Sequence, residues 1–130
     1  MAAGAAERRA ATIADLHRVK GVAEPAISPD GGRVAFTLTV TDLDAVHRQT
    51  NLWWTDADGK GARALTAADG FEWGPAFSPD GGTLAFISTR AGSPQVFFLP
   101  TTGGEARKRT DVPGGVGAFR FTPDGRRLVF

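Results

Sequence analysis

Short runs of apolar residues recur along this chain, and a shared polar turn phrase precedes three of them. The phrase is Ser-Pro-Asp-Gly at 28–31 and at 78–81, and Thr-Pro-Asp-Gly at 122–125. Proline presets φ for the first corner of a turn, aspartate can bond nearby backbone, and glycine accepts a positive φ. The pattern therefore predicts three strand-turn-strand units of the same design.

The spacing of these units predicts the fold. Fifty residues separate Asp30 from Asp80, and 44 separate Asp80 from Asp124. A repeat of about 40–50 residues with strand and turn chemistry is typical of a β-propeller, with one blade per repeat. We expect an all-β chain that forms an incomplete β-propeller of about two and a half four-stranded antiparallel blades, preceded by a short N-terminal α-helix.

The expected organisation follows from the repeat. Residues 1–20 form an N-terminal tail and a short helix, and residues 21–130 form a partial propeller. The first blade covers about 22–68, the second about 71–112, and the start of a third about 116–130. Within the second blade, the run Val96-Phe97-Phe98-Leu99 is apolar on both faces, as expected for a strand sandwiched between neighbouring blades.

Two segments depart from the blade pattern. A helix is predicted over 13–19, capped by Thr12 with Asp15, and ended by Gly21. Its apolar residues Ile13, Leu16 and Val19 share one face, so the helix should dock on something. A polar insertion, Val40–Asn51, interrupts the first blade, and it is either a solvated hairpin extension or a rim loop that reaches a ligand or a second domain.

A partial propeller has a physical consequence. Closed propellers need roughly four to eight blades, and the third copy of the repeat here stops inside a strand at Phe130. One blade face and an unfinished strand would then be exposed edges. We expect the isolated chain to be unstable or to aggregate.

Composition and charge restrict the partners. The chain is 42% hydrophobic and 22% charged, with a formal net charge of +1, so no strong field favours nucleic acid or a membrane surface. The cluster Arg107-Lys108-Arg109 reads as a solvated outer strand or as a small binding patch. There is no cysteine, and residues 1–11 lack the apolar core of a secretory signal, so we expect a cytoplasmic protein.

No catalytic residue is predicted within the chain. Serine catalysis needs a nucleophile beside a base that a third group orients. The candidate nucleophiles and bases are Ser28, Ser78, Ser88, Ser93, His17 and His47. Ser28 and Ser78 belong to the repeated turn, which has Thr122 in its third copy, and no Gly-x-Ser-x-Gly elbow is present.

No metal or cofactor site is predicted either. Asp56-x-Asp58-x-Lys60-Gly61 begins like a calcium loop, but Lys60 occupies a ligand position and Ala67 replaces the final glutamate. Gly59-x-Gly61-x-x-Ala64 resembles a loose dinucleotide pattern that precedes a strand rather than a helix. Both segments read as a turn between strands.

The order of these pieces resembles the N-terminal region of the prolyl oligopeptidase family of serine peptidases, and within it the acylaminoacyl-peptidase and dipeptidyl-peptidase-like branch. The matching features are the helix at 13–19 before Glu24-Pro25-Ala26-Ile27-Ser28-Pro29-Asp30-Gly31, then Thr50-Asn51-Leu52-Trp53 after the insertion, and Gly103-Gly104-Glu105-Ala106-Arg107. The resemblance covers nearly the whole chain from about Thr12.

This resemblance implies a substrate-gating propeller followed by a C-terminal α/β-hydrolase domain, absent from this chain, that carries a Ser-Asp-His triad and acts on short peptides. Those substrates would be N-acylated peptides, or peptides that lose dipeptides from the N-terminus. The resemblance assigns no substrate-binding role to Glu24, Glu72 or Glu105, and it leaves open whether the protein is a homo-oligomer. The alternative is a non-enzymatic, Tol-translocation-like propeller that binds protein partners.

Overall fold

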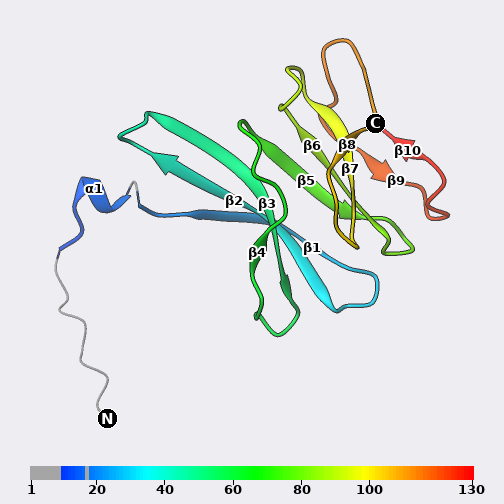
Figure 1. Ribbon diagram of the computed structural model, residues 1–130, viewed down its shortest axis with the longest axis horizontal. Coiled ribbons are helices and arrows are strands. Elements are labelled where there is room, and N and C mark those ends of the chain that lie inside the picture. The colour runs from blue at the N-terminus through cyan, green and yellow to red at the C-terminus, as the bar shows by residue number, and fades with distance from the viewer. Residues whose placement is uncertain (1–9, 17) are drawn as a thin grey trace.

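The computed structural model describes residues 10–16 and 18–130, and it is built almost entirely of antiparallel strands. Three sheets follow one another along the chain (Figure 1). The first, blade 1, has its strands in chain order: β1 (Gly21–Ile27), β2 (Arg33–Asp42), β3 (His47–Asp56) and β4 (Arg63–Ala64).

The second sheet, blade 2, repeats this plan, again with its strands in chain order: β5 (Glu72–Phe77), β6 (Thr83–Ser88), β7 (Gln95–Pro100) and β8 (Arg107–Lys108). The third sheet is the pair β9 (Arg120–Phe121) and β10 (Leu128–Val129). The predicted all-β fold of about two and a half four-stranded blades is confirmed.

Blade 2 has two apolar faces, as the sequence predicts for its central strands. Side chains alternate across a strand, so Leu84 and Phe86 point to one face and Ala85 and Ile87 to the other. The first face packs against blade 1 in a core that includes Ala35, Leu52, Trp54, Phe97 and Leu99. The second packs against the third sheet in a core that includes Val96, Val116, Phe98, Phe119 and Phe121.

The N-terminal helix is shorter than predicted. The structure has α1 at Ile13–Leu16, and β1 already begins at Gly21. Asp15 closes the first turn as expected, since its carboxylate accepts the Thr12 N–H at 2.8 Å. Short isolated helices are marginal, and the Ile13 side chain of this one is 76% exposed.

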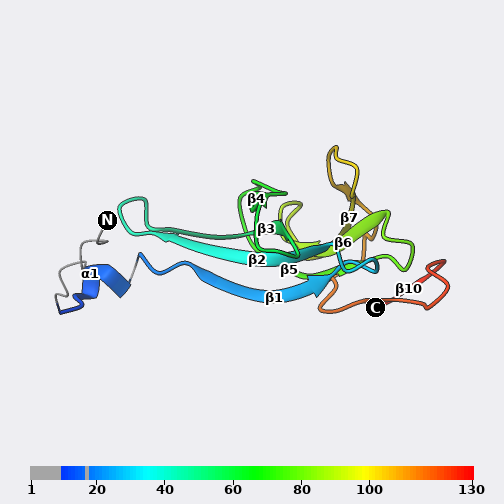
Figure 2. The ribbon, with the colours of Figure 1, turned by 90° about the horizontal axis from the view of Figure 1, so that it is seen from below.

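The insertion in blade 1 is strand rather than loop over most of its length. β2 and β3 stay paired from Arg33 with Asp56 out to Asp42 with His47, which leaves a loop of residues 43–46. β-branched residues favour this pairing, and the hydroxyls of Thr39 and Thr50 bond across the strands at 2.8 Å. The insertion is thus a hairpin extension, and it projects on the same side as α1 (Figure 2).

The outermost strands are shorter than the sequence indicates. The cluster Arg107-Lys108-Arg109 reads as an outer strand in the sequence, whereas β8 pairs only through Arg107 and Lys108. The chain leaves the sheet edge there because Thr110 turns inward, where its hydroxyl accepts the N–H of Val96 at 2.9 Å. Thr66 does the same for Leu52 at the end of blade 1.

Candidate functional site: the groove along the inner strands

The innermost strand of each complete blade carries a β-bulge at the same place. In β1 the pairing register shifts between Ala23 and Ala26, and in β5 it shifts between Trp73 and Ala76. The extra residues are Glu24-Pro25 and Gly74-Pro75, fifty residues apart. Proline fits such a bulge because its missing N–H is not needed for the ladder. Bulges re-aim side chains, and here the re-aimed residue is Glu24.

Glu24 has a strained backbone. Its φ is +52°, and the equivalent Gly74 has a φ of +61°. Glycine tolerates this left-handed region, but a residue with a side chain is destabilised there. One carboxylate oxygen of Glu24 accepts the N–H of Gly74 at 3.1 Å, which ties the two bulges together. Backbone strain of this kind clusters at functional positions.

A groove of about 690 Å³ runs along these bulges and the inner edge of the third sheet. Most of its walls are apolar, with the Glu24 carboxylate and the Arg120 guanidinium as its charged groups. The Trp73 indole N–H donates to the carbonyl of Gly117 at 3.3 Å and fixes the ring in the wall. The remaining lining residues are Gly74, Pro75, Ala76, Ile87, Ala118, Phe119 and Val129. An apolar cleft with a few convergent polar groups is the usual form of a ligand site.

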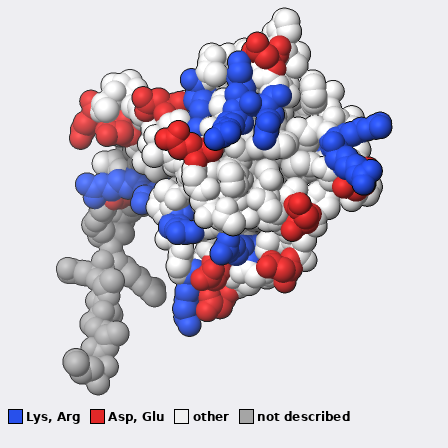
Figure 3. All heavy atoms as spheres, turned by 45° about the vertical axis from the view of Figure 1, so that its right-hand side comes forward, with Lys and Arg blue, Asp and Glu red and all other residues white. Residues whose placement is uncertain are grey.

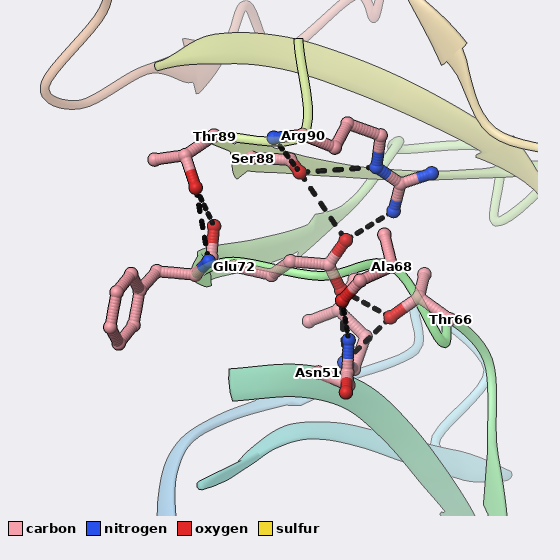
Figure 4. A network of polar contacts seen from close by, with 9 residues as sticks. Asn51, Thr66, Ala68, Glu72, Ser88, Thr89 and Arg90 are labelled. Atoms are coloured by element: carbon pink, nitrogen blue, oxygen red, sulfur yellow. Dashed lines mark hydrogen bonds and ion pairs between the residues drawn. The ribbon is translucent and has the colours of Figure 1, made fainter. Parts of the chain in front are cut away.

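A buried carboxylate joins blade 2 to blade 1 (Figure 4). Glu72 is 1% exposed, and its Oε2 accepts the N–H of Leu52 at 3.3 Å and the hydroxyl proton of Thr66. Its Oε1 accepts from Ser88 and pairs with the guanidinium of Arg90. The contacts come from both blades, so Glu72 is an inter-blade link rather than a ligand group.

This role of Glu72 was not predicted from the sequence, although the repeat contains a signal for it. Val22 and Val116 occupy the equivalent positions of the other two units. A carboxylate in a register position that is otherwise apolar is a candidate for a buried, paired charge.

A second polar motif recurs at a spacing of 44 residues. The Asn51 amide donates to the carbonyl of Ala68 at 2.9 Å, and the Gln95 amide donates to the carbonyl of Val112 at 2.9 Å. Gln95 is one carbon longer, so its oxygen also accepts from Thr110 at 2.7 Å. The equivalent hydroxyl of Thr66 donates to Glu72 instead.

In each of the repeated turns, the serine or threonine hydroxyl makes its hydrogen bonds within the turn itself. Ser28 donates to the Oδ1 of Asp30, and its oxygen accepts the N–H of Arg33 at 3.0 Å. Ser78 and Thr122 make the equivalent bonds. The bond from the hydroxyl, followed by the bond from the Gly32 N–H, lowers the pKa of Asp30 below its usual 3.8. The pKa of Asp80 and of Asp124 is lowered for the same reasons.

The other residues that the sequence offered as catalytic or binding candidates lie at separate places in the fold. His47 contacts Gln49 and Asp69 on the hairpin side, and His17 lies outside the described residues. Ser88 is buried against Glu72 and Arg90, and the Ser93 hydroxyl accepts from Gln95. Glu105 is an exposed residue of the segment between β7 and β8. None of the described serines is recorded beside a histidine.

The calcium-like and dinucleotide-like patterns lie in the turn between β3 and β4. The Asp56 N–H donates to the carbonyl of Lys60 at 2.9 Å there, and the Asp58 carboxylate accepts the N–H of Lys60 at 2.9 Å. Over residues 10–16 and 18–130, no three or more His, Cys, Asp or Glu residues are placed to hold a metal ion together.

Charges are interspersed over the surface. On the face that Figure 3 shows, groups of Lys and Arg side chains lie next to Asp or Glu side chains. In the cluster at 107–109, Lys108 pairs with Asp111 at 2.7 Å and the Arg109 guanidinium lies 5.1 Å from the centre of the Phe98 ring. No helix in the described part of the chain has the length and hydropathy to cross a membrane.

Comparison with known proteins places the chain among propellers. Residues 5–130 match the TolB β-propeller domain (PD40). The chain is 34% identical to an uncharacterized peptidase of Bacillus subtilis, YuxL, over 91% of this chain and 18% of the relative. It is 31% identical to dipeptidyl-peptidase 5 of Porphyromonas gingivalis, over 84% of this chain and 16% of the relative. The chain thus spans less than a fifth of the length of these curated relatives.

Solved structures give the same architecture. A putative TolB from Agrobacterium tumefaciens superposes with a TM-score of 0.68 at 29% identity, over 85% of this chain and 38% of the other. The acylaminoacyl peptidase of Pyrococcus horikoshii superposes with a TM-score of 0.71 at 18% identity, over 88% of this chain and 17% of the other. At this sequence identity, the similarity to the acylaminoacyl peptidase shows a shared fold alone.

Proposed function

The chain belongs to the TolB β-propeller domain family, and we propose that it is the substrate-gating propeller portion of a serine peptidase that hydrolyses short peptides. The observation that carries the proposal is the apolar groove along the bulged inner strands, with the strained Glu24 in its wall. The peptidase relatives support the enzyme class, since two of them are at least 31% identical over most of this chain.

In this proposal the groove admits the peptide and a second domain cuts it. That second domain is an α/β-hydrolase domain with a Ser-Asp-His triad, beyond the residues described here. Trp73 and Phe119 offer apolar surface to peptide side chains, and Glu24 and Arg120 orient the polar backbone. The substrates are N-acylated peptides, or peptides that lose dipeptides from the N-terminus. The absence of cysteine fits a cytoplasmic enzyme.

The test uses the full-length gene product. We expect it to react with a fluorophosphonate probe and to hydrolyse either an N-acetyl-amino-acid p-nitroanilide or a dipeptidyl p-nitroanilide. Trp73→Ala should lower kcat/KM for the peptide substrate and leave turnover of p-nitrophenyl acetate unchanged, because a small ester does not need the groove. Trp53→Ala, a tryptophan of β3 that does not line the groove, is the matched control.

The alternative is a binding propeller without catalysis, favoured by the 29% identity to the putative TolB over most of this chain. A full-length protein that neither labels with the fluorophosphonate nor hydrolyses either substrate would support this alternative. It would also contradict the peptidase proposal.

A further inference from the structure

The tip of the β2–β3 hairpin contains Val46, whose backbone conformation is unfavourable for a valine. Among the described residues other than glycine, positive φ occurs at Glu24 and at Val46, where it is +51°. A β-branched residue in this region is an outlier, and glycine or asparagine is usual at such a position in a hairpin loop. The Val46 side chain is 90% exposed, so no packing within the described chain offsets the strain.

The segment around Val46, residues 40–49, projects as a two-stranded extension that we call the finger (Figures 1 and 2). Its tip presents a second exposed aliphatic side chain, Leu43, at 49% exposure. It also presents two carboxylates. Asp42 accepts the N–H of Ala45 at 3.1 Å, while Asp44 has no hydrogen bond or ion pair to a described residue. The tip is thus apolar and negatively charged.

A cleft with complementary properties lies between the outer parts of blades 1 and 2. This Trp54 cleft has a volume of about 150 Å³, and its apolar walls include Trp54, Leu65, Leu99 and Pro100. The Arg33 and Arg63 guanidinium groups lie 4.3 Å and 4.9 Å from the centre of the Trp54 ring. Neither arginine takes part in an ion pair within the described part of the chain.

The finger cannot reach the cleft of its own molecule. His47 at the finger and Trp54 at the cleft belong to the same extended strand, β3. Seven residues separate them, which corresponds to about 23 Å along a strand. The two complementary surfaces can therefore meet only between two copies.

We propose that the finger of one copy docks into the Trp54 cleft of a second copy. Val46 enters the apolar part of the cleft, and Asp44 pairs with Arg63 at its rim. The contact joins two different surfaces, so it is head-to-tail and builds a closed ring where the rotation permits closure. The strain at Val46 is then compensated by burial that exists only in the assembly.

The test measures self-association of the full-length gene product by sedimentation velocity and light scattering. We expect a mass above that of the monomer. Asp44→Arg and Arg63→Asp should each weaken association by roughly tenfold or more, and the double variant should restore it, because the swapped charges attract again. Asp58→Arg changes an exposed aspartate in a different hairpin turn and should leave association unchanged.

Val46→Gly separates an interface role from a role in the turn. Glycine relieves the left-handed strain, so the melting temperature of the dissociated protein should rise while association weakens. A turn residue without an interface role would give the rise in melting temperature alone, and that result would overturn the proposal. A monomeric unaltered protein, or a double charge swap that fails to restore association, would also overturn it.

Discussion

The carboxylate of Glu72 accepts a hydrogen bond from the backbone N–H of Leu52, 3.3 Å away, across the boundary between two blades. Leu52 is fully buried and Glu72 is 1% exposed, so the bond lies in the interior where water does not compete for it. Because Arg90 pairs with the same carboxylate, the link consists of a charge pair as well as a hydrogen bond. Blades 1 and 2 are thus held by polar contacts in addition to their apolar core.

Glu72→Ala should therefore be strongly destabilising. The substitution leaves Arg90 without its partner and the Leu52 N–H without one of its acceptors, and breaking a buried pair costs about 3–5 kcal/mol. Chemical denaturation of the full-length protein measures the loss. Glu105→Ala, in the exposed segment between β7 and β8, is the control and should change the free energy of unfolding by less than about 0.5 kcal/mol. Equal effects of the two substitutions would contradict the role of Glu72.

Thr66 and Thr110, which occupy equivalent positions at the ends of blades 1 and 2, should contribute differently to the free energy of unfolding. Thr110→Val removes bonds to the Val96 N–H and to a neutral amide oxygen, and we expect a loss of about 1–3 kcal/mol. Thr66→Val removes a bond to the Leu52 N–H and one to the Glu72 carboxylate. Bonds to charged groups are stronger, so Thr66→Val should destabilise more in the same denaturation experiment. The reverse order would contradict a stronger hydrogen bond from Thr66 than from Thr110.

The turn aspartates predict acid sensitivity. In the folded state the pKa of Asp30, Asp80 and Asp124 lies below the usual 3.8, because hydroxyl and backbone N–H groups bond the carboxylates. A lowered folded-state pKa adds stability that is present above 3.8 and is lost as the pH falls through the folded-state value.

The measurement is denaturation of the full-length protein between about pH 5 and pH 2. The variant Asp30→Asn/Asp80→Asn/Asp124→Asn should be less stable than the unaltered protein above this range and should lose less stability within it. Parallel curves for the two proteins would show that other carboxylates govern acid unfolding.

Val46→Gly should stabilise the monomeric state. A left-handed backbone costs a residue with a side chain roughly 1–2 kcal/mol, and Val46 makes no buried contact that glycine would forfeit. Thermal denaturation at a protein concentration where the protein is monomeric measures the gain. Leu43→Gly, in the same loop, is the comparison and should bring no gain, because no strain is present at that position.

Residues 1–130 should be unstable or aggregate when they are expressed alone. Val22 and Ile27 on blade 1 and Val129 and Phe130 at the other end are each more than 60% exposed. Open apolar faces and unpaired strand edges favour association with other chains. We expect residues 1–130, expressed alone, to bind an apolar dye and to form heterogeneous particles in sedimentation. A monodisperse monomer with a cooperative melting transition would contradict this expectation.

The repeat made most of the architecture predictable. The turns at Ser28, Ser78 and Thr122 mark the first hairpin of each unit, because their residue types satisfy one backbone geometry. The alternation in β6 and β7 likewise predicts a blade with two packed faces. These features depend on local chemistry, which is the part that a single sequence expresses directly.

The features that escaped prediction depend on partners distant in the sequence or on context. The contacts of Glu72 reach 20 residues back to Leu52 and 18 forward to Arg90. The left-handed Glu24 follows from a bulge whose glycine appears in the other copy, at Gly74. The sequence left open whether the insertion at 40–51 is a hairpin extension or a rim loop, and cross-strand pairs such as Thr39 with Thr50 keep it extended.

When both faces of a strand are apolar, the alternation of apolar and polar residues no longer fixes its pairing register. In a sheet with one solvent-exposed face, shifting the pairing register by one residue would move the apolar side chains from the core to the solvent. Such a shift is therefore strongly disfavoured. In β7, the residues Val96, Phe97 and Leu99 are all buried, so a slip would exchange one apolar set for another. The polar residue at the start of the strand, Gln95, supplies alignment instead, because its amide and oxygen bond to Thr110 and Val112 in the observed register. Replacing Gln95 by leucine should therefore produce several coexisting alignments of blade 2 rather than a simple loss of stability.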